Sequence, residues 1–331
     1  MSWILVPSSP AQQLEADKHA HSTWGAPQLT LEQFLTRERE LSASDFAKET
    51  LTSYVLVPES EPDTLDILCY VEIFKRPCLY GGKIVTSYSI GSVYTPAQHR
   101  KKGYASLLLQ HVDKIIQAQD GSIVSNLYSD IGPTFYAAKG WTVHSSDELV
   151  FPLSLSLPPP STDVYLRPID SKEILAQVCR DDLAHMQALS TPSTVYFVLT
   201  PSCVEWFQVR SHFYARTLAG LPHVPKSVGI VATNDQNPLT NYMLWTHDYK
   251  YNILMILRCR VEEAAFPAFI NAAVAEAKQW SLETVCIWNP APWMAQAYAA
   301  YLEKRTDSLP SLKIHPEKEV TWLANEKYCW V

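Results

Sequence analysis

The sequence lacks any apolar run close to the length of about 18 residues that a membrane-spanning helix requires. Residues 1–7 contain no Lys or Arg, and their apolar stretch is too short for the core of a signal peptide. These absences predict a cytoplasmic protein that has no membrane partner.

Metal-binding patterns are also missing. The seven cysteines are odd in number and widely spaced, and neither C-x-x-C nor H-E-x-x-H occurs. His19 and His21 are only two residues apart, so they would not share one face of a helix. Most of the cysteines stand in apolar, strand-like segments. We therefore expect buried, reduced thiols and no metal site.

The chain has fewer basic than acidic residues. The 27 basic and 34 acidic residues give a net charge of −7, which argues against a chain-wide surface for nucleic acid or anionic lipid. Basic and aromatic residues do not interleave as they do in single-strand binders. Any basic cluster must therefore be local. Nothing in the composition indicates an oligomeric state.

Apolar and aromatic residues are plentiful. Hydrophobic residues make up 47% of the 331 positions and include 10 Trp and 17 Tyr, which is enough for a dense core. The length favours two domains, and the string Leu-Pro-Pro-Pro-Ser at 157–161 is typical of a semi-rigid linker. We predict an N-terminal domain over 1–156, a linker over 157–163 and a C-terminal domain over 164–331.

The first half alternates helical and strand patterns, which predicts an α/β (α+β) fold. Apolar spacing predicts a helix within 28–53. Residues rich in β-branched and aromatic types predict strands at 66–75 and 83–94, joined by Gly81 and Gly82. The elements expected next are a helix at 104–118, a strand at 122–128, a short helix at 133–139 and a strand at 147–153.

The second half repeats much of this order. Its expected elements are helices at 171–190 and 202–219, strands at 227–233, 241–247 and 252–260, a helix at 262–280 and a strand at 283–288. We therefore predict a diverged second copy of the first domain, although no fixed-period repeat is visible. The turn around Val261 and Glu262 has no glycine and is acidic, so this copy is not expected to bind a pyrophosphate.

A short basic segment stands where the strand at 83–94 should end and a helix should begin. Residues 100–105 read Arg-Lys-Lys-Gly-Tyr-Ala. Free N–H groups and the positive helix dipole at such a junction suit an anion, and Arg100, Lys101 and Lys102 add charge-assisted contacts. Gly103 and Ala105 allow close approach of the backbone. The alternative is a solvated charge run, but basic residues at a helix N-terminus are unfavourable by about 0.3–1 kcal/mol each.

This segment resembles motif A of the GNAT superfamily of N-acetyltransferases, whose R/Q-x-x-G-x-G/A loop is matched by residues 100–105. Residues 127–141 resemble motif B of the same family, in which a helix carries Tyr-x-x-x-Gly and then an aromatic residue; Tyr136, Gly140 and Trp141 match it. The resemblance implies a GNAT fold with a mixed, splayed sheet and acetyl-CoA as the cofactor. The second copy would make the arrangement a tandem of GNAT-like domains.

The resemblance also implies roles for individual residues. Val93, Tyr94 and Thr95 would bind the pantetheine arm, and nearby N–H groups would meet charge developing on the carbonyl. The loop of residues 100–105, with Tyr104, would hold the pyrophosphate, and Ser129 belongs to the same cofactor set. Tyr136 would protonate the departing thiolate; the alternative is a core aromatic side chain.

Glu72 is the candidate for the catalytic base. It interrupts an apolar strand, where an isolated acid is costly unless it is used or paired. The alternatives are an ion pair with Lys75 or Arg76, a solvated side chain at the sheet edge, or binding of a substrate ammonium. The carboxylate that follows Val331 is a further candidate, because some tandem relatives use theirs.

Most of the chain resembles the fungal lysine N6-acetyltransferases of lysine catabolism. The resemblance is carried by residues 67–75 with Glu72, residues 92–96, residues 127–132 and the aromatic end at 325–330. It implies acetylation of the ε-amine of free L-lysine. A peptide, protein or polyamine acceptor and a non-catalytic acyl-CoA sensor are the alternatives. Side chains of types suited to a lysine pocket, to which no roles are given, are Trp206, Arg210, Tyr214, Trp245, Asp248 and Trp288.

Overall fold

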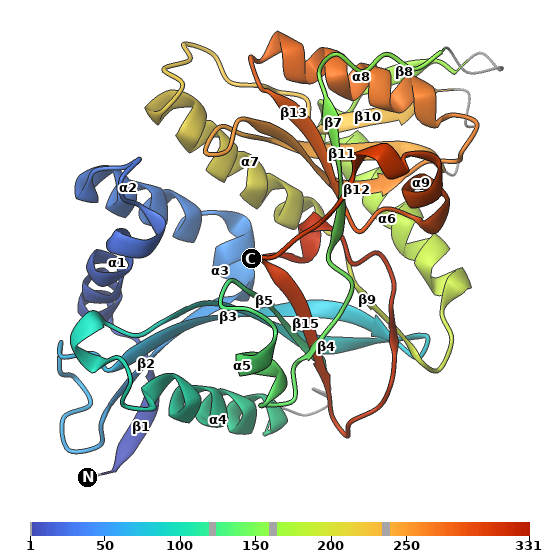
Figure 1. Cartoon of the computed structure of the whole chain (residues 1–331). Helices are drawn as coiled ribbons and strands as arrows, with labels where there is room; N and C mark the ends of the chain where they lie inside the picture. The colour runs from blue at the N-terminus through green and yellow to red at the C-terminus, as the bar shows by residue number, and fades with distance from the viewer. Residues whose placement is uncertain (1, 119–123, 159–163, 234–238) are drawn as a thin grey trace.

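The computed structural model describes residues 2–118, 124–158, 164–233 and 239–331. They form two mixed sheets, one in the lower and one in the upper part of Figure 1, with helices around and between them. The helices are α1 (Pro10–Trp24), α2 (Leu31–Ser42), α3 (Asp45–Thr50), α4 (Tyr104–Gln117), α5 (Thr134–Ala137), α6 (Lys172–Leu189), α7 (Pro201–Thr217), α8 (Phe266–Gln279) and α9 (Pro292–Ala297), with 3-10 turns η1 (Ala97–His99), η2 (Ala299–Tyr301) and η3 (Lys327–Cys329).

The first sheet has the strand order β1-β2-β3-β4-β5-β15-β6, with β9 pairing β3 and β16 pairing β9. Its strands are β1 (Trp3–Pro7), β2 (Leu51–Pro58), β3 (Cys69–Tyr80), β4 (Lys83–Tyr94), β5 (Val124–Ser129), β6 (Thr142–Val143), β9 (Thr194–Phe197), β15 (Leu309–Ile314) and β16 (Thr321–Trp322). β3 and β4 form the predicted antiparallel hairpin, and both Gly81 and Gly82 at its turn have positive φ. β4 and β5 are parallel and are joined through α4.

Helix α4 confirms the helix predicted at 104–118. Its apolar positions Leu108, Leu109, Val112 and Ile116 are all buried, and they pack against the face of β3 and β4. This packing fixes where the N-terminus of α4 points.

The N-terminal region differs from the prediction. The helix expected within 28–53 is two helices, because Ser44 caps a new helix, α3, and the β-branched and aromatic residues from Leu51 onward form β2. Strand β1 and helix α1 were missed. The buried positions of α1 include Gln12, Ala16 and Ala20, so its inner face is too small and polar to give an apolar stripe.

The second sheet has the strand order β14-β7-β13-β12-β11-β10-β8. Its strands are β7 (Asp147–Pro152), β8 (Leu166–Pro168), β10 (Gly229–Ala232), β11 (Tyr242–Asp248), β12 (Ile253–Arg260), β13 (Thr284–Trp288) and β14 (Leu302–Lys304). Strand β12 is parallel to β13 and is joined to it through α8, just as β4 is joined to β5 through α4. The predicted α6, α7, α8 and the strands β10 to β13 are present within one to four residues of their expected ends.

Each sheet contains strands from both sides of the expected linker. Strand β7 precedes the expected linker but lies in the second sheet, between β13 and β14, whereas β9, β15 and β16 follow the linker and complete the first sheet. A boundary at 157–163 therefore does not divide the chain between the sheets, and residues 159–163 lie outside the described part. Helix α7 packs between α2 and α3 on one side and β11 on the other, so the two layers share one interior (Figure 1).

The cysteines agree with the prediction: all seven are buried and none forms a disulfide. In the described part of the chain, no helix is long and apolar enough to cross a membrane.

Candidate active site

An opening in the first sheet lies where β4 leaves β5. The parallel pairing of these strands ends at Ile90 and Leu127. On its other side, β4 pairs with β3 through a bulge, since Glu72 lies opposite Gly91 but Tyr70 lies opposite Tyr94. Ser92 in this bulge has φ of 52°. The bulge turns the end of β4 away from β5, so residues 91–94 have no partner strand on that side within the described part of the chain.

A pocket adjoins this opening at the N-terminus of α4. Lys101 has φ of 62° and Gly103 has φ of 86°, so the loop turns twice through the left-handed region. No side chain caps α4 and its first turn holds no acid, which leaves backbone N–H groups facing the pocket. The pocket has a volume of about 310 Å³. Its lining residues are Thr95, His99, Arg100, Lys101, Gly103, Tyr104, Ala105, Ser106 and Phe135.

The predicted cofactor residues fall into two groups. Most of those in the loop line the pocket. Val93, Tyr94, Lys102, Ser129 and Tyr136, the last also predicted as a cofactor residue, do not line it, although Val93 and Tyr94 lie on the unpaired end of β4. Ser129 is buried and its hydroxyl donates to the Gly132 carbonyl oxygen at 2.7 Å, so it shapes the turn that follows β5.

Arg100 and Tyr94 contact one another beside the pocket. The Arg100 Nε atom donates to the Thr95 carbonyl oxygen at 3.0 Å, and Nη2 donates to the Tyr94 hydroxyl at 3.3 Å. The guanidinium also lies over the Tyr94 ring. Arg100 thus braces the strand end, while Lys101 and Lys102 are exposed and carry the free positive charge of the loop.

Tyr136 is on α5, below the end of the first sheet in Figure 1. It is buried, and its burial, followed by the charges of Asp130 and Cys69, raises the pKa of its hydroxyl above the ordinary value. Cys69 donates to or accepts from Thr95 Oγ1 at 3.2 Å, which puts Tyr136 near the end of β4. The phenol remains protonated at neutral pH and can act as a proton donor.

Glu72 is half-buried on β3 beside the bulge. It accepts hydrogen bonds from the Ser92 hydroxyl at 2.7 Å and from the Tyr70 hydroxyl at 2.8 Å. Burial, and next the negative charge of Glu38, raise its pKa, and these two hydrogen bonds oppose the rise. No ion pair with Lys75 or Arg76 forms, and Arg76 is instead buried against the carbonyl oxygens of Tyr328 and Cys329.

Further carboxylates near Glu72 were missed by the sequence analysis. Gln13 donates to Asp17 Oδ1 at 2.9 Å and to the Tyr70 hydroxyl at 2.7 Å, so a hydrogen-bonded chain connects Asp17 with Glu72. Burial, then Glu38 and Glu72, raise the pKa of Asp17 to about 7. Asp17 and Glu38 lie on α1 and α2, far from Glu72 in sequence, and no local signal marks them.

Comparison with known proteins identifies the family. A family model described as the LYC1 GNAT-like C-terminal domain matches residues 152–331, and one described as an acetyltransferase (GNAT) domain matches residues 49–144. The first match alone covers more than half of the 331 residues. The chain belongs to the GNAT family of acetyltransferases.

Individual GNAT relatives are distant. A lysine acetyltransferase of Yarrowia lipolytica is 32% identical over 168 residues, which is 44% of this chain and 41% of that protein. A GCN5-related N-acetyltransferase from Anabaena variabilis has a TM-score of 0.61 at 16% identity, covering 95% of this chain and 73% of that one. Saccharomyces cerevisiae N-myristoyltransferase with bound myristoyl-CoA has a TM-score of 0.55 at 12% identity, covering 95% and 79%. These structures confirm the predicted GNAT fold.

The end of this GNAT chain lies at the opening in the first sheet. In Figure 1 the C-terminus is between the two sheets. A Cβ atom on Gly91 would lie 3.4 Å from Val331 Cγ2 and 3.5 Å from its backbone oxygen. Val331 is therefore next to Ser92 and close to Glu72. The tail over residues 324–331, hereafter the C-terminal tail, contributes to the same site.

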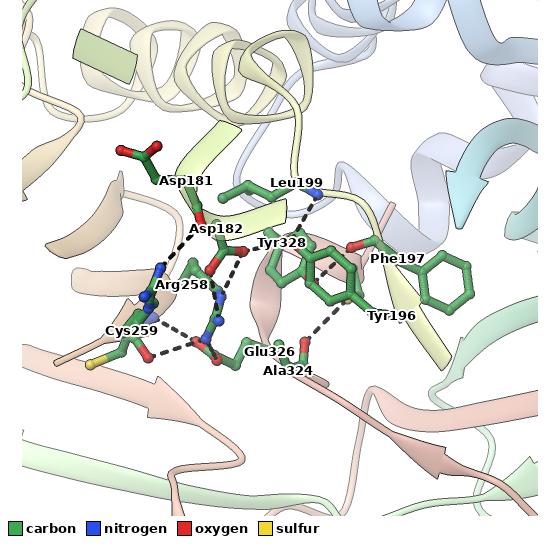
Figure 2. Close-up of polar contacts among 12 residues, drawn as sticks. Asp181, Asp182, Tyr196, Phe197, Leu199, Arg258, Cys259, Ala324, Glu326 and Tyr328 are labelled. Carbon is green, nitrogen blue, oxygen red and sulfur yellow. Dashed lines mark hydrogen bonds and ion pairs between the residues drawn. The ribbon is translucent and has the colours of Figure 1, made fainter. Parts of the chain in front are cut away.

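A buried ionic network holds the C-terminal tail in place (Figure 2). Arg258 of β12 pairs with Asp182 of α6 at 2.9 Å and with Glu326 of the tail at 2.5 Å. Glu326 also accepts from the Cys259 backbone N–H at 2.6 Å, and Tyr196 of β9 donates to Asp182 at 2.6 Å. Removing one member would leave the others charged and unpaired in the interior.

The six side chains whose types suit a lysine pocket do not all lie in the same place. Trp206, Tyr214 and Trp245 belong to the hydrophobic core, and Trp206 also contacts the Trp330 ring of the tail. Asp248 ends β11, and its carboxylate accepts from the Lys250 backbone N–H. Trp288 contacts Lys327 of the tail, and Arg210 contacts both Tyr214 and Trp330. The second half thus supplies side chains to the region around the tail.

Proposed function

We propose that this GNAT protein transfers the acetyl group of acetyl-CoA to the ε-amine of free L-lysine and forms N6-acetyl-L-lysine. The single observation that carries the proposal is Glu72, a half-buried acid with a raised pKa on the strand next to the opening between β4 and β5. The Yarrowia relative that is a lysine acetyltransferase supports the choice of acceptor. The resemblance to enzymes of lysine catabolism extends the proposal to lysine degradation in the cytoplasm.

The residues of the first sheet fit acetyl-CoA. The unpaired backbone of residues 91–94 can pair with amides of the pantetheine arm, and the N-terminus of α4 with Lys101 offers donors and charge to a pyrophosphate. One solved structure of similar fold holds an acyl-CoA. Acetyl-CoA, when bound, supplies an activated acetyl thioester.

Glu72 would accept a proton from the substrate. An alkyl ammonium has a pKa of about 10.4, so freeing its amine at pH 7 costs about 4.6 kcal/mol. Burial and Glu38 raise the pKa of Glu72 toward neutral pH, which makes its carboxylate a stronger base. The nearby acids Asp17 and Glu38 would attract the incoming ammonium.

Tyr136 would donate a proton to the thiolate that leaves. Its raised pKa keeps the phenol protonated, and a thiolate leaving group benefits from a donor because a free thiol has a pKa of about 8.5. Tyr136→Phe should lower kcat about 100-fold or more with little change in the affinity for CoA.

The decisive experiment offers the protein acetyl-CoA together with a pool of amino acids, diamines and peptides, and locates the transferred acetyl group by mass spectrometry. Formation of N6-acetyl-lysine supports the proposal. Labelling of peptides or polyamines alone would replace lysine with another acceptor, and CoA binding without transfer to any amine would make the protein an acyl-CoA sensor.

A further inference from the structure

We propose that Arg210, with Lys250 beside it, forms a subsite for the α-carboxylate of the amine substrate. The inference rests on the proposed function and narrows it, because it makes the substrate a free α-amino acid. Diamines and lysine residues within a protein lack this carboxylate.

Arg210 is a cation that has no counter-charge in the described part of the chain. It is half-buried on α7, and its guanidinium lies 5.3 Å from the centroids of both the Tyr214 and the Trp330 rings. Among the described residues, it has neither a hydrogen bond nor an ion pair with any group. Desolvating an unpaired guanidinium is costly, and the two rings hold it with its N–H edges available. A carboxylate is the ligand that fits its planar fork in a bidentate manner.

Lys250 adds a second positive charge. Its Nζ atom donates to the Trp24 carbonyl oxygen at 3.4 Å, and Arg37 Nη1 donates to the same oxygen at 3.5 Å. Burial, followed by Arg210 and Arg37, lowers the pKa of Lys250 to about 8. The cations are thus close enough to repel one another, and a bound anion would relieve that repulsion.

Arg210 and Lys250 are hereafter called the positive wall. A third basic side chain, Lys327 of the C-terminal tail, lies near it and is only partly protonated at neutral pH. It lies between Trp288 and Trp330, at 4.1 Å and 3.9 Å from their ring centroids. Burial lowers its pKa to about 7, and Arg210 contributes to the lowering.

The acids near these cations have other partners. Asp248 accepts from the Lys250 backbone N–H at 3.0 Å, and Asp130 accepts from the backbone and the hydroxyl of Ser308. Asp248 and Asp130 raise the pKa of Lys250 and of Lys327, but only after the larger effect of burial. Neither acid forms an ion pair with Arg210, Lys250 or Lys327 in the described structure.

The positive wall and Glu72 belong to the same site. Trp330, which contacts Arg210, precedes Val331, and Val331 lies against Gly91. Gly91 precedes Ser92, which donates to Glu72. On the other side, Arg210 lies over Tyr214, whose hydroxyl accepts from Arg37 at 2.6 Å, and Arg37 pairs with Glu38. Arg210 and the carboxylates are therefore connected by direct contacts along two routes.

The site has acidic side chains at one end and basic side chains at the other. The proposed substrate likewise has its ε-ammonium at one end and its α-carboxylate at the other. The carboxylates near the opening would receive the ε-ammonium, while Arg210 and Lys250 would bind the α-carboxylate at the far end of the aliphatic stem. The half-buried ring of Trp330 can line the path between the two ends. Such a site would select free lysine by its two charged ends.

The test compares L-lysine with cadaverine, the diamine that lacks the carboxylate, in the wild type and in Arg210→Met. We expect the substitution to lower kcat/KM for lysine about 100-fold through KM, and to leave kcat/KM for cadaverine within about 2-fold. Arg210→Lys, which retains the charge but not the fork, should be intermediate. The matched control is Arg216→Met on the same helix, since Arg216 is exposed and pairs with Glu40.

Each outcome decides the proposal. An equal loss for lysine and cadaverine in Arg210→Met, with an unchanged melting temperature, would mean that Arg210 positions α7 and does not bind substrate. A wild type that acetylates cadaverine as efficiently as lysine would refute the subsite while leaving amine acetylation intact. A wild type that acetylates neither would refute the proposed function. Calorimetric titration of its CoA complex with L-lysine would then decide the subsite, which is refuted if lysine does not bind or if Arg210→Met binds it equally well.

Discussion

The two sheets of the molecule carry the same opening, and only one of them is available to a ligand. In the first sheet the parallel pairing of β4 and β5 ends at Ile90 and Leu127. In the second sheet the pairing of β12 and β13 ends at Ile256 and Ile287. Strand β12 also has a bulge against β11, between the pairs Leu244 with Arg258 and Trp245 with Ile256. The backbone of the second copy thus retains the geometry of the first.

The second opening is filled by the chain itself. Glu326 accepts from the Cys259 backbone N–H inside it and pairs with Arg258 (Figure 2). The turn before α8 closes on itself, because the Ala265 and Phe266 N–H groups donate to the Glu262 carbonyl oxygen. No basic residue or left-handed glycine is present in this turn.

The difference between the two openings shows what a GNAT sheet needs, beyond splayed strands, to bind a phosphate-bearing ligand. Splayed strands alone offer backbone donors to any partner, and here the partner is a side chain of the same protein. Both helices that follow the openings, α4 and α8, lack a side-chain cap. The first sheet adds a glycine turn and lysines before its helix, and these suit a phosphate-bearing ligand. The second sheet has become the anchor of the C-terminal tail, and through the tail it forms one wall of the site. The predictions below test this division of roles.

The largest expected effect is on stability, at Arg258 in the second opening. Arg258→Met should lower the free energy of unfolding by about 3–5 kcal/mol, because Asp182 and Glu326 would remain charged and unpaired in the core. Denaturant unfolding measures the loss. Arg216→Met, the control, removes an exposed ion pair and should cost at most about 1 kcal/mol. Equal losses in the two variants would contradict the anchoring role.

Glu72 in the first sheet should affect catalysis. Glu72→Gln is expected to lower kcat about 100-fold or more at neutral pH, because the amide cannot accept the proton of the substrate. CoA affinity, measured by calorimetry, should not change. The control is the exposed Glu61→Gln. A Glu72→Gln variant with full activity would show that Glu72 is not the catalytic base.

The turn at Gly103, which has no counterpart in the second sheet, should affect the affinity for CoA. Gly103 has φ of 86° and an added Cβ would meet no atom within 4 Å, so Gly103→Ala changes only the backbone preference. We expect a loss of about 1 kcal/mol, or roughly 5-fold in CoA affinity. Glu262→Lys in the second sheet should produce no second CoA site, because its turn has no left-handed glycine and Glu326 occupies the opening beside it. Binding of two CoA molecules per chain would contradict the conclusion that only the first sheet is available to the cofactor.

The sequence predicted the parts of the site that are local. Residues 100–105 and Tyr136 follow fixed spacings along a strand, a turn and a helix, so their elements could be placed in advance. Strand exchange could not be predicted, because β7 and β15 look like ordinary strands and their partners are distant in the chain. Asp17 and Glu38 lie on charged helices where nothing distinguishes them from neighbouring surface acids. Glu326 lies in the segment 325–330 that carried the resemblance, but the sequence does not indicate its partner. Only packing brings these acids to their places.

The smallest predicted effect is a shift in the pH profile caused by Glu38. Its negative charge helps to raise the pKa of Glu72, second only to burial. Glu38→Gln removes that charge and leaves Arg37 without its partner, and both changes lower the pKa of Glu72. A base with a lower pKa stays deprotonated at lower pH, so the acid limb of kcat/KM should move to lower pH. Glu40→Gln, on the same helix but paired with the exposed Arg216, should leave the limb in place. An unmoved limb in Glu38→Gln would mean that Glu38 does not act on the base, and that burial and the hydrogen bonds from Ser92 and Tyr70 set the pKa of Glu72.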